Sequence, residues 1–139
     1  MPVGFSERCD AIEECYEFML AYAGQGLSSD EGSQSGGQVR EFLHRAIRAL
    51  TGMADSCAEE VEEQGLESSG KYQAFMAVLD RDARDSLAAF ELVLAQPVIS
   101  SQLIDNLNAS IHLRALLTDL FLFDEILKAQ RKPKPAVTS

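Results

Sequence analysis

Residues 5–23 read FSERCDAIEECYEFMLAYA, and their apolar side chains recur with the spacing of an α-helix. The apolar stripe steps by four and three residues and consists of Phe5, Cys9, Ile12, Tyr16, Met19 and Ala23. A second apolar stripe runs beside it, and acidic residues occupy the opposite face. This pattern is typical of a helix that buries one side. It predicts a helix from about Ser6 to Ala23, with Ser6 as the N-cap.

Three further segments repeat this spacing, at residues 38–64, 70–95 and 101–130. Gly65 stands where a left-handed residue would end the second segment, and Ser100 or Ser101 is placed to cap the fourth. No stretch shows the alternation of a half-buried strand. We therefore expect an all-α fold, a four-helix up-down-up-down antiparallel bundle. A domain-swapped or side-by-side dimer of such bundles is the alternative architecture.

The first two predicted helices are joined by a stretch that is rich in glycine and serine. Residues 24–38 hold five glycines and four serines and very little that is apolar. We expect a flexible linker at residues 25–37 that is open to proteases and long enough to permit a domain swap. Residues 1–130 then form one helical domain, followed by a basic tail at residues 131–139 whose prolines favour disorder.

Acidic residues outnumber basic ones by 22 to 12, which gives a net charge of −10. Residues 1–127 hold all 22 acidic residues and only eight basic ones, a net charge of −14. Such a body repels phosphate backbones, so we expect no nucleic-acid partner. No apolar run approaches the roughly 20 residues of a membrane span, and no signal peptide is visible. Three cysteines without metal-ligand spacing fit a reducing compartment, so we expect a cytoplasmic protein with no membrane partner.

Glu41 and His44 have the E-x-x-H spacing that places both side chains on one helical face. Ferritin-type diiron bundles use two such motifs and two further inward carboxylates. The second motif is missing around His112, and arginines flank Glu41 and His44. This setting favours a solvated charged face, with no bound metal or other cofactor. A ferritin-like metal-binding or redox bundle with Glu41 and His44 as ligands is the alternative.

His44 also has the setting of a phosphorylated histidine. Histidine phosphotransfer domains are helical bundles of this size with an exposed histidine near basic residues, and Arg45 and Arg48 supply these here. Those domains show a lysine and a glycine within four residues after the histidine, where this chain has Ile47 and Arg48. A histidine phosphotransfer domain using His44 is the second alternative. His112 lies in an apolar segment, so we expect a hydrogen-bonded core or interface residue there.

Residues 111–127 carry apolar side chains on nearly every helical face. One layer of neighbours in a small bundle cannot cover such a helix, and the first helix also offers two adjacent stripes. We expect the surplus side chains to form the interface of a homodimer, the commonest soluble oligomer. The interface candidates are Phe18, Tyr22, Leu116, Phe121 and Phe123. The predicted function is a non-enzymatic adaptor or accessory subunit that oligomerises, binds a protein partner and has no catalytic residue.

Overall fold

The computed structural model describes residues 4–66 and 70–131 of the chain. This part is all-α, with six helices and no strand. The helices are α1 (Phe5–Ala23), α2 (Gln34–Leu50), α3 (Met53–Glu63), α4 (Gly70–Leu94), α5 (Ser101–Ala109) and α6 (Ile111–Arg131). The all-α prediction is confirmed, whereas the second and the fourth of the expected helices are each divided in two.

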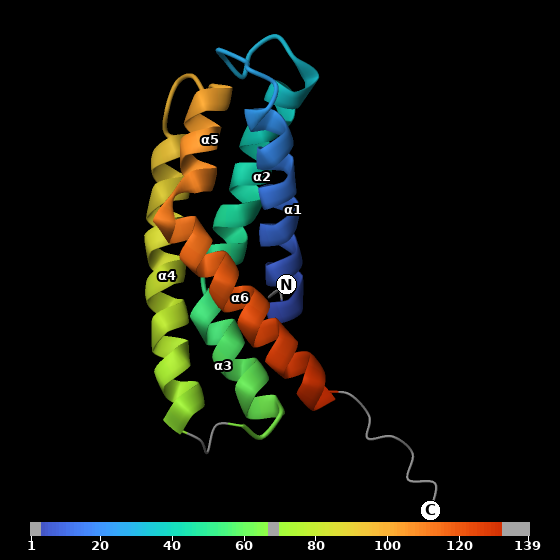
Figure 1. Ribbon diagram of the computed structural model, residues 1–139, viewed down its shortest axis with the longest axis vertical. Coiled ribbons are helices and arrows are strands. Elements are labelled where there is room, and N and C mark those ends of the chain that lie inside the picture. The colour runs from blue at the N-terminus through green and yellow to red at the C-terminus, as the bar shows by residue number, and fades with distance from the viewer. Residues whose placement is uncertain (1–3, 67–69, 132–139) are drawn as a thin grey trace, which may run out of the picture.

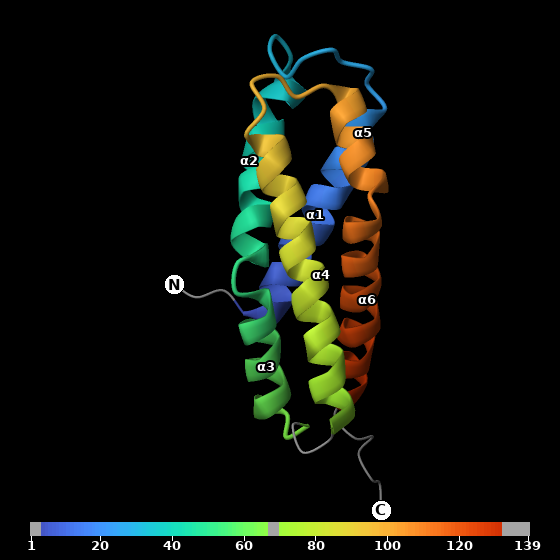
Figure 2. The ribbon, with the colours of Figure 1, turned by 90° about the vertical axis from the view of Figure 1, so that its left-hand side faces the viewer.

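Most of the helices run along the long axis of the molecule, and α6 crosses the front obliquely (Figure 1). In the perpendicular view, α3 continues below α2 and α6 continues below α5, while α4 passes between these pairs (Figure 2). α1 packs against α2 and α5, and α4 packs against α2, α3 and α6. Because α1 begins at mid-height, the lower end of the molecule is built from α3, α4 and α6 (Figure 1).

The apolar stripes of the helices meet in one core. The buried residues of α1 are Phe5, Cys9, Ile12, Cys15, Met19 and Tyr22. Cys15 and Tyr22 come from the second stripe of this helix, so both stripes contribute to the core. They do so because α1 contacts α2 on one side and α5 on another. Tyr16 of the first stripe is only half-buried and reaches the surface.

The second expected helix is interrupted at Gly52. Thr51 is extended and Gly52 is left-handed, with a φ of 80°, so the backbone turns between α2 and α3. Glycine takes up this conformation without steric cost. The guanidinium of Arg8 in α1 donates hydrogen bonds to the carbonyls of Arg48, Ala49 and Thr51 at 3.3, 2.9 and 2.6 Å. The prediction of one continuous helix was wrong because the apolar stripe continues on both sides of this break.

The fourth expected helix is interrupted at Ser110. This residue is extended, with a φ of −63° and a ψ of 145°. Its Oγ accepts a hydrogen bond from the Leu113 N–H at 3.2 Å, as a serine at a helix N-terminus does. Ser110 therefore ends α5 and caps α6.

Two predicted helix ends are confirmed and one is wrong. Gly65 is left-handed, with a φ of 71°, and backbone hydrogen bonds of the Schellman type close the end of α3. Ser100 caps α5, because its Oγ accepts a hydrogen bond from the Leu103 N–H at 3.0 Å. Ser6 does not cap α1, since the helix starts one residue earlier and Gly4 takes the N-cap position.

No helix within the two described ranges is long and apolar enough to cross a membrane. The predicted basic tail lies outside the described residues, apart from Arg131, at which α6 ends.

Candidate partner-binding groove

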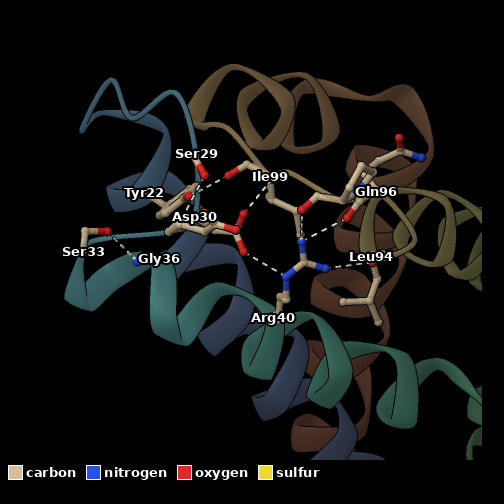
Figure 3. A network of polar contacts seen from close by, with 11 residues as sticks. Tyr22, Ser29, Asp30, Ser33, Gly36, Arg40, Leu94, Gln96 and Ile99 are labelled. Carbon is tan, nitrogen blue, oxygen red and sulfur yellow. Dashed lines mark hydrogen bonds and ion pairs between the residues drawn. The ribbon is translucent and has the colours of Figure 1, made fainter.

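Polar contacts hold the segment between α1 and α2, where the sequence predicted a flexible linker at residues 25–37 (Figure 3). The Asp30 carboxylate accepts hydrogen bonds from the Ile99 N–H at 2.9 Å and from Nε of Arg40 at 2.8 Å. Burial alone would raise the pKa of Asp30. The hydrogen bonds from Ile99 and Arg40 outweigh burial and hold that pKa below its ordinary value.

Arg40 extends this network to the end of α4. Its guanidinium donates hydrogen bonds to the carbonyls of Leu94 and Gln96 at 3.1 and 3.0 Å (Figure 3). Carbonyls at a helix C-terminus lack partners within the helix, so a cation is favourable there. Asp30 and Arg40 therefore form a structural clamp in which the charges and the backbone groups satisfy one another.

The linker prediction needs correction on two counts. α2 already begins at Gln34, so the last residues of the predicted linker are helical. The segment is also tied to α5, because the Leu27 N–H donates to Ser101 Oγ at 2.9 Å and the Ser101 N–H donates to the Leu27 carbonyl at 2.8 Å. The composition of residues 25–37 does not reveal these contacts, since their partners lie about 70 residues away along the chain.

Glu41 and His44 lie on the exposed side of α2. The Glu41 carboxylate is 3.7 Å from Nε of Arg45 and 3.8 Å from Nη2 of Arg48. The Arg45 guanidinium also covers the Phe42 ring at 4.5 Å from its centroid. Within the described residues, no group of three histidines, cysteines or acids is placed to hold a metal ion. The contacts of Glu41 are therefore those of a solvated charged face.

His112 and the three cysteines are the remaining residues with distinctive chemistry. The His112 side chain is exposed, so the core alternative of its prediction is wrong, while the interface alternative stays a prediction. Its backbone carbonyl accepts a hydrogen bond from Ser86 Oγ at 2.9 Å. The buried free cysteines are Cys9, Cys15 and Cys57. Burial is the main cause that raises the pKa of each thiol to about 12. Such thiols are not nucleophiles near neutral pH, and they act as small core side chains.

The structure divides the five predicted interface residues into three groups. Tyr22, Leu116 and Phe123 lie in the chain's own core with 1% of their surface exposed or less. Phe18 is half-buried and stacks on an aromatic ring of α2 at 4.2 Å. Phe121 is 50% exposed on the outside of α6. The interface prediction is corrected for the three buried residues, and Phe121 remains a candidate.

Phe123 is buried because of the place where α1 begins. α1 begins at mid-height beside α6 (Figure 1), and its first residue is Phe5. The ring of Phe123 is 6.0 Å from the ring of Phe5 in an edge-on contact and 5.6 Å from the ring of Phe75, on which it stacks. Tyr72 approaches edge-on at 6.2 Å. A count of apolar faces on one helix does not include these neighbours.

Phe121 borders a shallow groove between α1 and α6. The groove has a volume of about 160 Å³. It is lined by Tyr16, Arg114, Leu117, Thr118 and Phe121. Leu20, one helical turn after Tyr16, is 49% exposed and lines a separate hollow beside α5, together with Leu27 and Ser101. We call the surface formed by Tyr16, Arg114, Leu117, Thr118 and Phe121 the α1–α6 groove; its apolar part is Tyr16, Leu117 and Phe121.

Acidic side chains crowd one end of the α1–α6 groove. Glu13 lies one turn before Tyr16, and burial, followed by the charges of Asp10 and Asp124, raises the pKa of its carboxyl. Lys128 opposes this shift and forms an ion pair with Asp124 at 3.2 Å. Burial is the main cause of this shift, and the negative charges of Asp10 and Asp124 add to it, so a cation placed at this end of the groove would lower the pKa of Glu13. The acidic rim consists of Asp10, Glu13, Glu17 and Asp124.

A second hollow lies on the other side of α6, between α4 and α6. It has a volume of about 310 Å³ and is mainly apolar. It is lined by Lys71, Tyr72, Phe75, Leu122, Phe123 and Ile126. Leu122 is 52% exposed, almost the same as Phe121. These two sequence neighbours therefore offer equal apolar surface on opposite sides of α6.

Tyr16 was predicted to lie in the core stripe, but it reaches the surface and lines the α1–α6 groove. The signal available for this placement was the acidic pair Glu13 and Glu17 on either side of the tyrosine. Comparison of the chain with protein-family models, curated proteins and solved structures gives no match.

Proposed function

We propose that the protein acts by binding rather than by catalysis, as an adaptor whose α1–α6 groove receives an amphipathic helix of a partner protein. The partner helix carries large apolar side chains with lysine or arginine beside them. One observation carries the proposal: an exposed groove in which Tyr16, Leu117 and Phe121 form an apolar part, with Arg114 also in its lining and an acidic rim at one end. We further propose that α2 with α3 and α5 with α6 form the second and fourth arms of a four-helix up-down-up-down bundle, and that the adaptor works in the cytoplasm.

The apolar part of the groove supports the binding of a helix. Phe121 leaves about half of a large side chain in water, and Tyr16 beside it is only half-buried. Covering such surface stabilises a complex by about 25 cal/mol per Å². Helices that dock in grooves present anchors at positions i, i+3, i+4 and i+7, a spacing that fits a groove between two helices.

The acidic rim supports a basic partner over a second copy of the chain. A second copy seated on the groove would bring its own acidic residues, and each copy carries a net charge of −10. Like charges at an interface oppose association, whereas lysine or arginine beside the rim would offset the charges of Asp10 and Asp124, which add to burial in raising the pKa of Glu13. The predicted homodimer remains a competing proposal, because it would use the same exposed Phe121.

The test uses the full chain and two synthetic helical peptides. Both peptides carry leucine at positions i, i+3, i+4 and i+7, and their flanking positions hold lysine in one peptide and glutamate in the other. Fluorescence anisotropy of the labelled peptides measures binding. We expect the lysine peptide to bind at least about tenfold more tightly than the glutamate peptide, and added salt to weaken its binding.

Two variants test where the peptide binds. Phe121→Ser should weaken binding of the lysine peptide by about tenfold or more, since an aromatic anchor is lost. Leu122→Ser is the matched control, because Leu122 is equally exposed but faces the other hollow, and its affinity should stay within about twofold. Equal binding of both peptides, or a loss caused by Leu122→Ser alone, would refute the proposal. A stable wild-type dimer that Phe121→Ser dissociates, measured by light scattering, would show that a second copy occupies the groove.

A further inference from the structure

A buried carboxyl pair joins α4 to α6. Asp119 lies in the apolar run of α6 with only 7% of its surface exposed, and its Oδ2 has no hydrogen-bond partner in the described part of the chain. The carboxyl of Asp82 on α4 is the neighbouring group that acts on Asp119, both as a hydrogen-bond partner and as a charge. An ionised carboxylate can only accept hydrogen bonds, so this contact requires a proton on one of the two groups.

The charges of the neighbouring helices do not neutralise this pair. The charged residues at neighbouring positions of the packed helices are Arg81, Arg84 and Asp85 of α4, Glu13 and Glu17 of α1, Asp105 of α5, and Arg114 and Asp124 of α6. Arg84 is turned toward Asp80, at 3.0 Å, and Glu13 interacts with Asp124 instead. Among the described residues, the charge that acts on Asp119 is that of Asp82.

We propose that Asp82 and Asp119 share one proton, and that loss of this proton loosens the contact between α4 and α6, which makes the pair a pH-sensitive switch. Two negative charges would then touch in a poorly solvated site, where their repulsion is weakly screened. The nearest other link between these helices, from Ser86 Oγ to the His112 carbonyl, involves no titratable group and would persist.

The titration of the pair falls in the physiological range. Burial, with smaller contributions from the hydrogen bond and the charge of Asp82, raises the pKa of Asp119 from 3.8 to about 7. Between these two values the folded chain holds a proton that the unfolded chain has lost. The stabilisation is therefore fully present below about pH 4 and is lost as the pH rises to about 7.

The switch has a consequence for the α1–α6 groove. Asp119 precedes Phe121 by two residues on the same helix, so a displacement of α6 from α4 moves one wall of the groove. This consequence rests on the proposed function, whereas the shared proton does not.

Thermal unfolding of the full chain at pH values from 5 to 8 tests the switch. In Asp119→Asn, the amide can donate a hydrogen bond to Asp82 at every pH, as the shared proton does in the wild type. Between pH 5 and pH 7.5, we expect the Tm of the wild type to fall by about 5 °C or more relative to that of Asp119→Asn. Asp85→Asn is the control, because Asp85 is exposed on α4, and this variant should follow the wild type.

Two outcomes would overturn the shared proton. One is an identical pH profile for the wild type and Asp119→Asn. The other is a rise in Tm at pH 8 on addition of calcium that Asp119→Asn abolishes, because the pair would then hold a cation. If Asp119→Asn does not fold, Asp82→Asn serves instead, since Asp82 is only half-buried.

Binding of the lysine peptide at pH 6 and pH 8 tests the link to the groove. Weaker binding at pH 8 in the wild type, but not in Asp119→Asn, supports the link. Equal binding at both pH values overturns the link and leaves the shared proton standing. Absence of binding at both pH values refutes the proposed function, while the unfolding experiment still decides on the switch.

Discussion

Replacement of Asp30 by alanine should release the segment between α1 and α2 from the rest of the molecule. The Asp30 side chain is 10% exposed, and its carboxylate accepts hydrogen bonds from the Ile99 N–H and from Arg40. A hydrogen bond to a charged group contributes about 1.5–3 kcal/mol. Arg40 is 35% exposed and keeps its hydrogen bonds to backbone carbonyls in this variant. Water therefore partly compensates Arg40 for the loss of the ion pair with Asp30. We therefore expect the free energy of unfolding to fall by about 3 kcal/mol.

Chemical denaturation and limited proteolysis measure the two effects. The unfolding midpoint of Asp30→Ala should move to lower denaturant with little change in slope. Cleavage within residues 25–33 should become faster than in the wild type, because the segment is then held mainly by Leu27 and Ser101. Glu31→Ala is the matched control: Glu31 is exposed on the same segment, and its removal should change stability by less than about 0.5 kcal/mol.

The pH dependence gives an independent check. The pKa of Asp30 is lowered in the folded state, so its stabilisation is present above the ordinary value of 3.8 and is lost as the pH falls through the lowered value. The difference in stability between the wild type and Asp30→Ala should therefore shrink below about pH 4. A loss under about 0.5 kcal/mol at pH 7, or unchanged proteolysis, would show that the clamp does not hold the segment.

Three further predictions concern the core and α2. Gly36→Ala should destabilise the chain by roughly 1–3 kcal/mol, because a Cβ would overlap the Asp30 backbone. Gly37→Ala should stabilise the chain by about 0.5–1 kcal/mol, since Gly37 has open space around it. Denaturant midpoints compare the two variants, and equal effects would contradict the close approach of Gly36 to Asp30. Tyr22→Phe should cost about 1–1.5 kcal/mol in the same assay, because the hydrogen bond to the Ile99 carbonyl at 2.7 Å is lost, and a neutral result would mean that the carbonyl finds another donor. The three cysteines should not react with a thiol reagent at pH 8 in the native chain and should all react after unfolding, and rapid native labelling would contradict their burial.

The helical segments of this fold could be predicted from periodicity, but their breaks could not. The stripe of α1 and the Gly65 end of α3 depend on residues that are close in sequence, so the spacing contains the information. The breaks at Gly52 and Ser110 do not disturb the apolar stripe. The backbone at Gly52 is left-handed, and Arg8 of another helix stabilises the turn there. A serine such as Ser110 can also occur inside a helix, so its presence in the sequence does not predict a break.

The candidate groove was only partly accessible to sequence reasoning. Phe121 was expected at an interface because residues 111–127 carry more apolar side chains than one helix face holds, and its exposure fits that reasoning. Phe123 was expected beside it, but it lies in the core, because α1 starts at mid-height and brings Phe5 against α6. The acidic rim was invisible for a similar reason: Glu13 and Asp124 are far apart in sequence and meet only when α1 and α6 pack.

The tie from Arg8 to the end of α2 has a consequence for the order in which the chain folds. The contact joins residues 40 to 43 positions apart, and it needs α1 in place before the turn at Gly52 is fixed. During synthesis, α1 emerges first and presents this guanidinium to a helix that is still growing. A fragment that lacks α1 would keep Gly52 but lose the hydrogen bonds from Arg8 to the end of α2. In such a fragment, we expect α2 and α3 to adopt a range of angles about Gly52. In the intact chain, α1 is made before α2 and α3 and acts as the template that sets the angle between them.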